Sequence, residues 1–495
     1  MPSTTPKKNK SARRANRARK STGAAPSRKV RVRTYRHGLG DCHLLTFSKP
    51  DGSHFNILID CGVVNRTRNP GPLMTDVARD IAKESHRVLD LVVATHQHTD
   101  HLSGFKQAAE EFEPGKITMK RLWLAWTEDP QNPLGKRIQR QLVKKLAAVR
   151  QAAAKLTALN HEAAARIQGV LDFFGPGGQT QAILDKLQER LDTQVTYYNP
   201  GDVFPLPEVP GVRVYVLGPP TDPAYLKVTG PRKSKREGYE EADLAADAAG
   251  FVDAILPELG EGNVELSYPF ERRHRRDSAQ MQNDAFFKEH YFGVDADNGE
   301  DQTWRQIDTA WLEVAEQIAL AVNDITNNTS LALAFEFIES GEVLLFPGDA
   351  QIGSWLTWQN LLWKVTDGKG LERDVSIGDL FSRTVFYKAS HHASHNGTLS
   401  GLGLGVVGLE QMTHRDLISV VPVDRDMAKE MSWDRTLPWK PLLDRLAEKT
   451  RGRLVLTDRK ESPPDPAKLA NLSNVERQRF KQQIVVSPYF VDYSL

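Results

Sequence analysis

A short run of histidine and aspartate directly after an apolar segment constrains this chain more than any other feature. The run occupies residues 95–101 (THQHTDH) and follows the apolar stretch 89–94 (LDLVVA). It places three imidazoles and a carboxylate within six positions. A strand that ends in such a loop delivers several donor side chains to one point, as a metal site requires. The alternative is an ordinary histidine-rich surface loop.

The spacing within the run suggests how the donors divide between metal ions. His96 and His98 alternate along extended backbone, so their side chains can lie on the same side. Asp100 and His101 follow where we expect the chain to turn into a helix at about residues 102–112. This geometry offers one pair of ligands to one metal and the next pair to a second metal nearby. Imidazole and carboxylate donors without a thiolate suit a hydrolytic zinc, manganese or iron site.

Bulk composition points to a globular protein without a membrane-spanning segment. The 495 residues suffice for one large domain with insertions or for two to three smaller ones, and 40% are hydrophobic and 26% charged. No apolar run approaches the roughly 20 residues that span a bilayer, and the N-terminus lacks the apolar core of a signal peptide. Two cysteines, Cys42 and Cys61, are too few for a disulfide framework or a cysteine-based zinc site. We therefore expect a cytoplasmic protein with no membrane association.

The charge is distributed unevenly along the chain. Residues 1–40 hold 13 Lys and Arg and no acidic residue, whereas the remainder holds 52 basic and 63 acidic residues. Residues 1–28 have hardly an apolar side chain, so we expect a disordered basic tail. Such an arm can neutralise phosphates non-specifically. A solubilising tail is an equally good interpretation, and an Arg- and Ser-rich transit peptide is a further one.

Strand-rich segments alternate with two segments of different character. Residues 29–124 are rich in strand patterns. Residues 128–192 carry apolar side chains at helical spacing and predict a helical insertion that packs on the core. Residues 221–325 are polar and irregular, with helices expected near 239–257 and 304–323, and we interpret them as an insertion that caps or borders the site.

Two more segments end strands with metal-competent groups. A hairpin expected over residues 331–346 leads to Asp349, and a strand expected at 385–389 leads to His391, His392 and His395. The order of a strand, a loop that carries a ligand and a helix recurs along the chain. This order implies an α/β sandwich whose site lies at the ends of the strands.

Taken together, these three segments resemble the metallo-β-lactamase (MBL) fold superfamily, and within it the hydrolase domain of competence-type DNA-uptake proteins. The motifs that carry the resemblance are GLGD (38–41), LIDCG (58–62), NNTS (327–330), LLFPGDA (344–350) and KASHHAS (388–394), besides the run at 95–101. The resemblance implies an αββα sandwich over residues 29–495, with the helical insertion (128–192) and the capping insertion (221–325) added to it.

The resemblance also implies a set of metal ligands. One complete position takes Asp100, His101, Asp349 and His392, where His392 aligns with the ligand in related Ser-Gly-His-Ala-Ser patterns of nucleases. The other position takes His96, His98 and a share of Asp349, which would bridge the two ions. Asp60 is expected to support the ligand loop from behind, or else to be a structural strand-end residue.

Two of the chain's departures from the family concern its first metal and its relation to the membrane. Many superfamily members supply a third histidine to the first metal, but the matching place falls near residues 218–220 (GPP), which contain none. His161, His274 and His290 are weaker substitutes, and we expect the first metal to be held weakly. The uptake proteins carry membrane spans, whereas this chain has no such segment, so DNA transport is not expected.

These observations predict a metal-dependent hydrolase, most specifically a phosphodiesterase or nuclease that uses a metal-activated hydroxide. We expect zinc in two sites, with manganese as the alternative, and Asp100 as a ligand that serves catalysis. His395 and His391 are candidates to protonate the leaving oxygen, and Lys388 or Ser394 to contact the phosphate. Each of these four has strand-end packing or capping as its alternative role.

Two other functions remain open at this point. One is hydrolysis of a small ester, lactone, thioester or cyclic nucleotide selected by the insertion. The other is a non-catalytic, metal-stabilised module that binds a partner in a multi-protein defence or repair system. Nucleic acid is the partner that the basic tail favours, whereas the acidic remainder argues against a broad DNA-binding surface.

Overall fold

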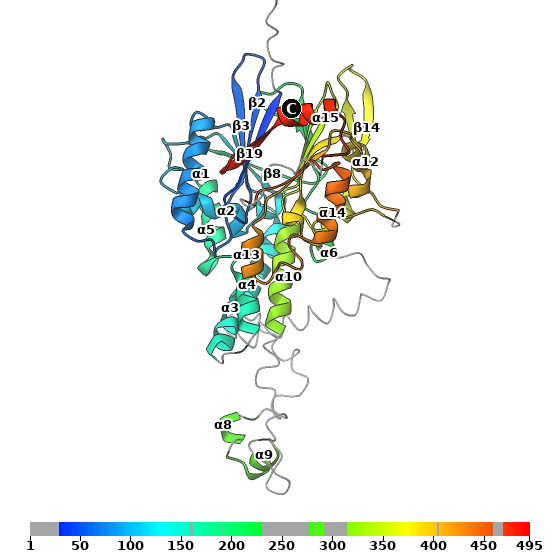
Figure 1. Cartoon of the computed structure of the whole chain (residues 1–495). Coiled ribbons are helices and arrows are strands. Elements are labelled where there is room, and N and C mark those ends of the chain that lie inside the picture. The colour runs from blue at the N-terminus through cyan, green and yellow to red at the C-terminus, as the bar shows by residue number, and fades with distance from the viewer. Residues whose placement is uncertain are drawn as a thin grey trace, which may run out of the picture.

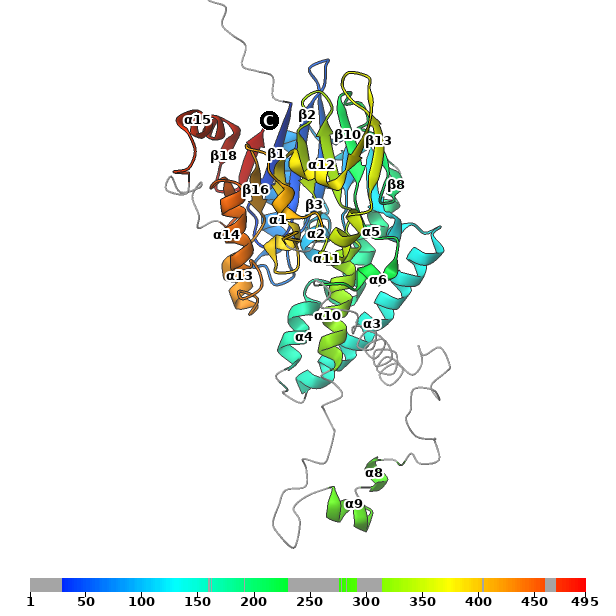
Figure 2. The same ribbon diagram turned by 90° about the vertical axis from the view of Figure 1, so that its right-hand side faces the viewer.

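Two β-sheets stack face to face, with helices on both outer faces (Figures 1 and 2). The computed structural model describes residues 29–158, 161, 163–190, 192–229, 276, 278–281, 283–291, 314–402, 405–458 and 469–495. The architecture is the α/β sandwich with insertions that the sequence predicts. The expected basic tail and most of the expected capping insertion lie outside the described residues.

The larger sheet is antiparallel along one half and parallel along the other. Its eight strands follow the spatial order β18 (Ile484–Val486), β19 (Phe490–Ser494), β1 (Val30–Tyr35), β2 (Cys42–Ser48), β3 (His54–Cys61), β5 (Leu91–Val93), β7 (Arg121–Ala125) and β8 (Gln194–Tyr198). The strands β3, β5, β7 and β8 run parallel, so their carboxyl ends meet at one edge. The run at 95–101 lies at this edge because it directly follows β5.

The second sheet brings its own ligand loops to its parallel part. Its seven strands follow the order β17 (Leu454–Leu456), β16 (Ile418–Val421), β15 (Thr384–Lys388), β12 (Val343–Phe346), β11 (Leu333–Phe337), β10 (Val212–Val216) and β9 (Val203–Pro205). The strands β12, β15, β16 and β17 run parallel. Asp349 therefore lies just after the carboxyl end of β12, and His392 lies just after the carboxyl end of the neighbouring strand β15. Two short pairs complete the strands: β13 (Leu362–Thr366) with β14 (Glu372–Ser376), and β4 (Val88–Leu89) with β6 (Thr118–Met119).

An apolar layer between the sheets fixes their relative position. Alternate side chains of both sheets point into it, and its aromatic members interlock. The ring centroids of Phe47 and Phe335 lie 6.0 Å apart, and those of Phe346 and Phe386 lie 5.4 Å apart. Because this layer joins strands β2, β11, β12 and β15, it also holds the ligand-bearing loops of both sheets on the same side of the sandwich.

Helices cover the two outer faces with their apolar sides. The larger sheet is covered by α1 (Pro70–Glu84), α2 (Thr99–Gln107) and α5 (Gln179–Gln188). The second sheet is covered by α11 (Ile352–Trp358), α12 (Ile377–Ser382) and α14 (Lys440–Lys449). Shorter elements are α6 (Pro223–Leu226), α8 (Ser278–Met281), α9 (Ala285–His290), α13 (Arg425–Glu430) and α15 (Asn474–Gln483). None of the helices in the described part of the chain has both the length and the apolar character to cross a membrane.

A helical group extends the sandwich at the ligand end. Helices α3 (Pro133–Ala158), α4 (Ala163–Leu171) and α10 (Val314–Asn328) pack on one another below the sheets in Figure 2. Helix α10 runs to Asn328, although the sequence predicts a helix over 304–323 and strands from residue 327. The buried stripe of Ile318, Val322 and Ile325 explains the longer helix, because it keeps helical spacing up to the strand connection.

Candidate metal centre

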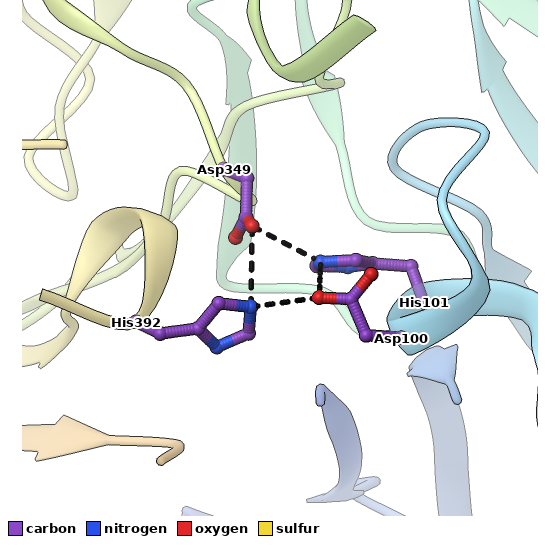
Figure 3. Close-up of side chains that lie close together, drawn as sticks. All are labelled: Asp100, His101, Asp349 and His392. Carbon is purple, nitrogen blue, oxygen red and sulfur yellow. Dashed lines mark hydrogen bonds and ion pairs between the residues drawn. The ribbon is translucent and has the colours of Figure 1, made fainter. Parts of the chain in front are cut away.

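Four donor side chains from three remote segments meet at the carboxyl ends of the strands (Figure 3). Asp100 and His101 lie in the first turn of α2, Asp349 follows β12, and His392 follows β15. One donor atom from each residue lies within 4.8 Å of the other three. The structure thus brings together all four ligands that the resemblance assigns to the complete metal position.

The distances within the cluster are those of donors around a small cation. Nε2 of His392 lies 3.0 Å from Oδ2 of Asp100 and 3.2 Å from Oδ2 of Asp349. Nε2 of His101 lies 3.2 Å from Oδ2 of Asp349. All four residues are buried, yet Oδ1 of Asp100 and Nε2 of His101 have no hydrogen-bond partner. Two imidazoles and two carboxylates with such unpartnered atoms fit a divalent metal ion.

Both histidine ligands are oriented by their other ring nitrogen. Nδ1 of His101 lies 2.7 Å from Oδ2 of Asp60, and Nδ1 of His392 lies 2.8 Å from the carbonyl oxygen of Pro422. An acceptor at Nδ1 fixes the tautomer that leaves Nε2 free to bind a metal. Asp60 also accepts the backbone N–H and the hydroxyl of Thr95, at 2.8 and 2.7 Å. It supports the ligand loop from behind, as the sequence predicts.

Close backbone approaches bring the first ligand loop against the strands. A Cβ on Gly62 would lie 2.4 Å from the carbonyl oxygen of Thr99 and 2.6 Å from the amide nitrogen of His101, so only glycine fits there. The backbone N–H of Asp41 donates to the carbonyl oxygen of Asp100 at 2.8 Å. The glycine-containing motifs at 38–41 and 58–62 therefore pack directly on the ligand turn.

The carboxylates give the site a strong demand for positive charge. Burial disfavours the imidazolium form of both histidines, but Asp349 and the other carboxylates outweigh it. They raise the pKa of His392 to about 10 and the pKa of His101 well above its ordinary value. In the other direction, burial would raise the pKa of Asp349, but His392, Lys388 and His101 hold it well below the usual range. The buried carboxylates thus favour positive charge within the cluster.

Lys388 is buried beside the cluster and pairs with Asp349 and Asp41. Its buried ammonium donates to the carbonyl oxygen of Gly348 at 2.9 Å and to Oδ1 of Asp349 at 3.0 Å, and it pairs with Oδ2 of Asp41 at 2.5 Å. These three contacts use its three N–H donors. The expected contact of Lys388 with a phosphate stays a prediction, and it would require the ammonium to exchange one of these three partners for the substrate. In the structure, Lys388 holds the carboxylate of Asp349 in place.

His96 and His98 lie beside the cluster but form no comparable set. Nε2 of His96 and Nδ1 of His98 are 3.0 Å apart. Among the described residues, no third His, Cys, Asp or Glu completes a three-donor group with this pair. Of the weaker substitutes, His161 accepts the backbone N–H of Ala163 through Nδ1 at 3.2 Å. His290 packs against Phe286 on α9, and His274 lies outside the described residues.

The two candidate proton donors differ in position. His391 is buried between two amides: Nδ1 lies 3.0 Å from Oδ1 of Asn396, and Nε2 lies 3.3 Å from Nδ2 of Asn327. Burial lowers the pKa of His391 to about 4. His395 lies at the surface, and the hydroxyl of the buried Ser394 lies 3.4 Å from its Nδ1. Surrounding protein atoms still shield its ring partly from water, and this desolvation lowers the pKa of His395 as well.

The turn that carries His392 has unusual backbone conformation. His391, His392 and Ala393 all have left-handed φ values, 49°, 50° and 62°. Each such non-glycine residue costs on the order of 1 kcal/mol or more, so surrounding contacts must hold the turn. Sequence reasoning missed this turn and also missed the partners Asp41 and Pro422. The GLGD motif was a signal for Asp41, whereas no sequence signal distinguishes the carbonyl of Pro422.

A cavity of about 540 Å³ lies between the segment 127–130, helix α3 and helix α5. Gln97, between the two histidines of the pair, donates to Oε2 of Glu128 at 2.5 Å, and Glu128 lines the cavity. Lys136, Arg140 and Lys144 line it from one face of α3. Burial raises the pKa of Glu128 to about 7 despite the hydrogen bonds that Gln97 donates. Gln97 also donates to Oε1 of Gln139, another lining residue, at 3.4 Å, so two side-chain hydrogen bonds link the cavity wall to the ligand loop.

Replacing the carboxylate behind His101 should weaken metal binding. We expect Asp60→Asn to lower the affinity for Zn²⁺ by roughly 10- to 100-fold, because an amide orients and polarises the imidazole less well. Competition titration with a fluorescent chelator measures this change. Asp90→Asn is the matched control, since Asp90 is also a buried aspartate and its carboxylate accepts from the amide of Asn56 and the ammonium of Lys120, remote from the metal ligands. Equal affinities in Asp60→Asn and the wild type would contradict the assignment.

The raised pKa of Glu128 predicts a pH dependence of stability. An acid whose pKa rises from about 4.5 unfolded to about 7 folded stabilises the protein fully below pH 4.5 and loses this contribution as pH rises to 7. Compared with Glu128→Gln, the free energy of unfolding of the wild type should therefore decline over that window, as measured by urea titration. Glu113→Gln, at an exposed carboxylate, should decline in parallel with the wild type. Parallel curves for Glu128→Gln and the wild type would refute the prediction.

Comparison with known proteins finds a family match for one part of the chain. A family model of the metallo-beta-lactamase superfamily matches residues 38–196, and no curated protein matches the chain. The matched segment contains the run at 95–101, and the fold brings Asp349 and His392 beside it from outside the match. The particular likeness to competence-type proteins stays a prediction. Residues 38–196 are thus matched as a metallo-β-lactamase superfamily domain, and the second sheet with Asp349 and His392 packs on them.

Proposed function

We propose that this protein is a metal-dependent phosphodiesterase that acts on nucleic acid. The observation that carries the proposal is the buried cluster of Asp100, His101, Asp349 and His392 at the strand ends. The superfamily match favours a metal-dependent hydrolase, because members of this superfamily are mostly hydrolases that use divalent metal ions. Zinc is our first choice of metal and manganese the second, since the donors are two imidazoles and two carboxylates.

A divalent ion bound by these four residues would supply Lewis-acid chemistry, lowering the pKa of water and neutralising charge that develops on a phosphate. Neighbouring residues orient the four ligands toward one point. Asp60 and the carbonyl of Pro422 hold the two imidazoles with Nε2 toward the centre. Lys388 holds Asp349 through Oδ1, so Oδ2 faces the histidines. Such fixed donors need little reorganisation when charge develops.

Proton transfer to the leaving oxygen is better assigned to His395 than to His391. Oδ1 of Asn396 accepts from Nδ1 of His391, while the amide of Asn327 donates to Nε2. His391 therefore has its one proton engaged and serves to position the turn. His395 lies at the surface beside the same turn, where a substrate can reach it.

The cavity beside the ligand loop supports a polyanionic substrate. Lys136, Arg140 and Lys144 stand one helical turn apart on α3, which spaces their positions by roughly 6 Å along the helix axis. A row of evenly spaced cations suits a chain with repeating negative charge. Three acidic residues, Glu128, Asp129 and Asp185, line the other walls of the same cavity, so the attraction for a polyanion is confined to the α3 wall.

A substrate panel tests the proposed reaction. Purified protein with Zn²⁺ or Mn²⁺ should cleave single- or double-stranded DNA or RNA, and His101→Ala should lower the rate by roughly 10³-fold or more, because several kcal/mol of charge stabilisation is lost. The control is His54→Ala, at an exposed histidine of β3. Activity on esters, lactones or thioesters without any on phosphodiesters would replace the proposal by a small-substrate hydrolase. No activity on any of these substrates would favour a binding module.

The row of cations on α3 gives a second test, which concerns substrate size. Lys136→Ala combined with Arg140→Ala should raise KM for an oligonucleotide several-fold and lower the salt dependence of its binding by about one to two units of slope. Hydrolysis of a small phosphodiester such as bis(p-nitrophenyl) phosphate should not change. The control pair is Lys83→Ala with Lys116→Ala, which removes two exposed lysines away from the cavity. Equal effects of both pairs on oligonucleotide binding would exclude α3 as the contact.

A further inference from the structure

We infer that this protein holds one resident divalent metal ion per chain, in the Asp100–His101–Asp349–His392 position, and that the His96–His98 pair is not a second resident metal site. The resemblance to the superfamily leads one to expect two ions. The inference concerns metal content and does not depend on which substrate the enzyme cleaves. Three independent observations separate the two positions.

The first observation is the number of donors. The resident position has four protein donors within 4.8 Å of one another. The pair offers Nε2 of His96 and Nδ1 of His98, and the described residues add no third His, Cys, Asp or Glu within the same reach. The resemblance places a third histidine near residues 218–220, which contain none, and a Cβ on Gly218 would already lie 3.3 Å from the carbonyl oxygen of Ser330. Zinc sites in proteins use three or four protein ligands, so two leave the pair incomplete.

The second observation is the support behind each imidazole. A ligating histidine almost always donates its other N–H to a fixed acceptor. His101 and His392 have such acceptors in Asp60 and Pro422. Nε2 of His98, in contrast, is buried without a hydrogen-bond partner, and its ring packs against Phe173 and Phe174 at centroid distances of 5.5 and 4.8 Å. An apolar wall neither fixes the tautomer of His98 nor raises its basicity.

The third observation is the state of the carboxylate that would bridge two ions. Oδ2 of Asp349 faces His101 and His392, but Oδ1 is held at 3.0 Å by the ammonium of Lys388. The same ammonium pairs with Asp41. The ammonium of Lys388 thus pairs with Oδ1 of Asp349, and its positive charge disfavours a metal ion at this oxygen. Lys388 therefore neutralises the side of Asp349 that a second ion would otherwise contact.

His96 has a clear role without a second ion. Its Nδ1 lies 3.0 Å from the hydroxyl of Thr95 and 3.2 Å from the hydroxyl of Ser330. Thr95 donates to Asp60, and Ser330 accepts the backbone N–H of Asp349 at 3.0 Å. His96 therefore sits in a hydrogen-bonded chain between Asp60 and Asp349, and we assign it as a positioning residue for the resident site.

Metal stoichiometry tests the inference directly. The full-length protein is stripped with a chelator, titrated with Zn²⁺ in a calorimeter, dialysed and analysed by elemental mass spectrometry. We expect one binding event and one ion retained per chain. The combined variant His96→Ala/His98→Ala should still retain one ion, with a loss of affinity but not of stoichiometry. His392→Ala should retain none, and Asp349→Asn provides the same comparison should the first variant fail to fold, which circular dichroism would reveal.

Two ions retained by the wild type, with one lost in His96→Ala/His98→Ala, would overturn the inference. Two ions that fall to one in His274→Ala would overturn it as well, by showing that a residue outside the described part completes the pair. A spectroscopic measurement gives an independent answer. Protein loaded with excess Mn²⁺ and dialysed should show the electron paramagnetic resonance spectrum of isolated ions, whereas a spin-coupled signal would show two adjacent ions and contradict the single site.

Discussion

Buried carboxylates must find positive partners, and this requirement organises the ligand end of the protein. Asp41, Asp60, Asp100 and Asp349 are all at most 1% exposed, and each faces a histidine or Lys388. Leaving any one of them unpaired would cost several kcal/mol. Lys388 neutralises Asp41 and Asp349, while His101 and His392 face the carboxylates of Asp60, Asp100 and Asp349. A divalent ion bound by the cluster would add positive charge beside these carboxylates and would use Nε2 of both histidines as ligands.

Much of this centre can be predicted from sequence, because its ligands stand at strand ends in recognisable order. The run at 95–101, Asp349 and His392 each follow an apolar strand, and parallel strands bring such positions to one edge. The role of Lys388 could not be predicted in the same way. A lysine at the end of a strand has the same local pattern whether its ammonium turns outward to a phosphate or inward to Asp41. Only the packing of the GLGD loop against the turn of Asp100 decides between them.

The insertions show where sequence patterns stop being informative. Apolar residues at helical spacing predict the helices of 128–192, but not what they touch. In the structure, the backbone N–H of Thr99 donates to the carbonyl of Phe173, and the rings of Phe173 and Phe174 cover His98. The segment therefore shapes one side of the ligand loop and also provides the cationic wall of the adjoining cavity. Such long-range contacts depend on how α3 and α4 dock on α10, which no local periodicity encodes.

The donors of the resident position come from both halves of the sandwich, two from the loop after β5 in the larger sheet and one each from the loops after β12 and β15 in the second sheet. An ion held there would add a cross-link between layers that are already joined at this end by apolar contacts, by the ion pair of Lys388 with Asp41 and by the hydrogen bond from the amide of Leu331 to the carbonyl of Thr95. Metal binding and the packing of the two layers are then thermodynamically linked. An ion that binds only the folded protein raises the free energy of unfolding, and a more stable fold binds the ion more tightly. For a cell, the supply of one trace element would set not only how fast this protein works but also how long each copy survives proteolysis.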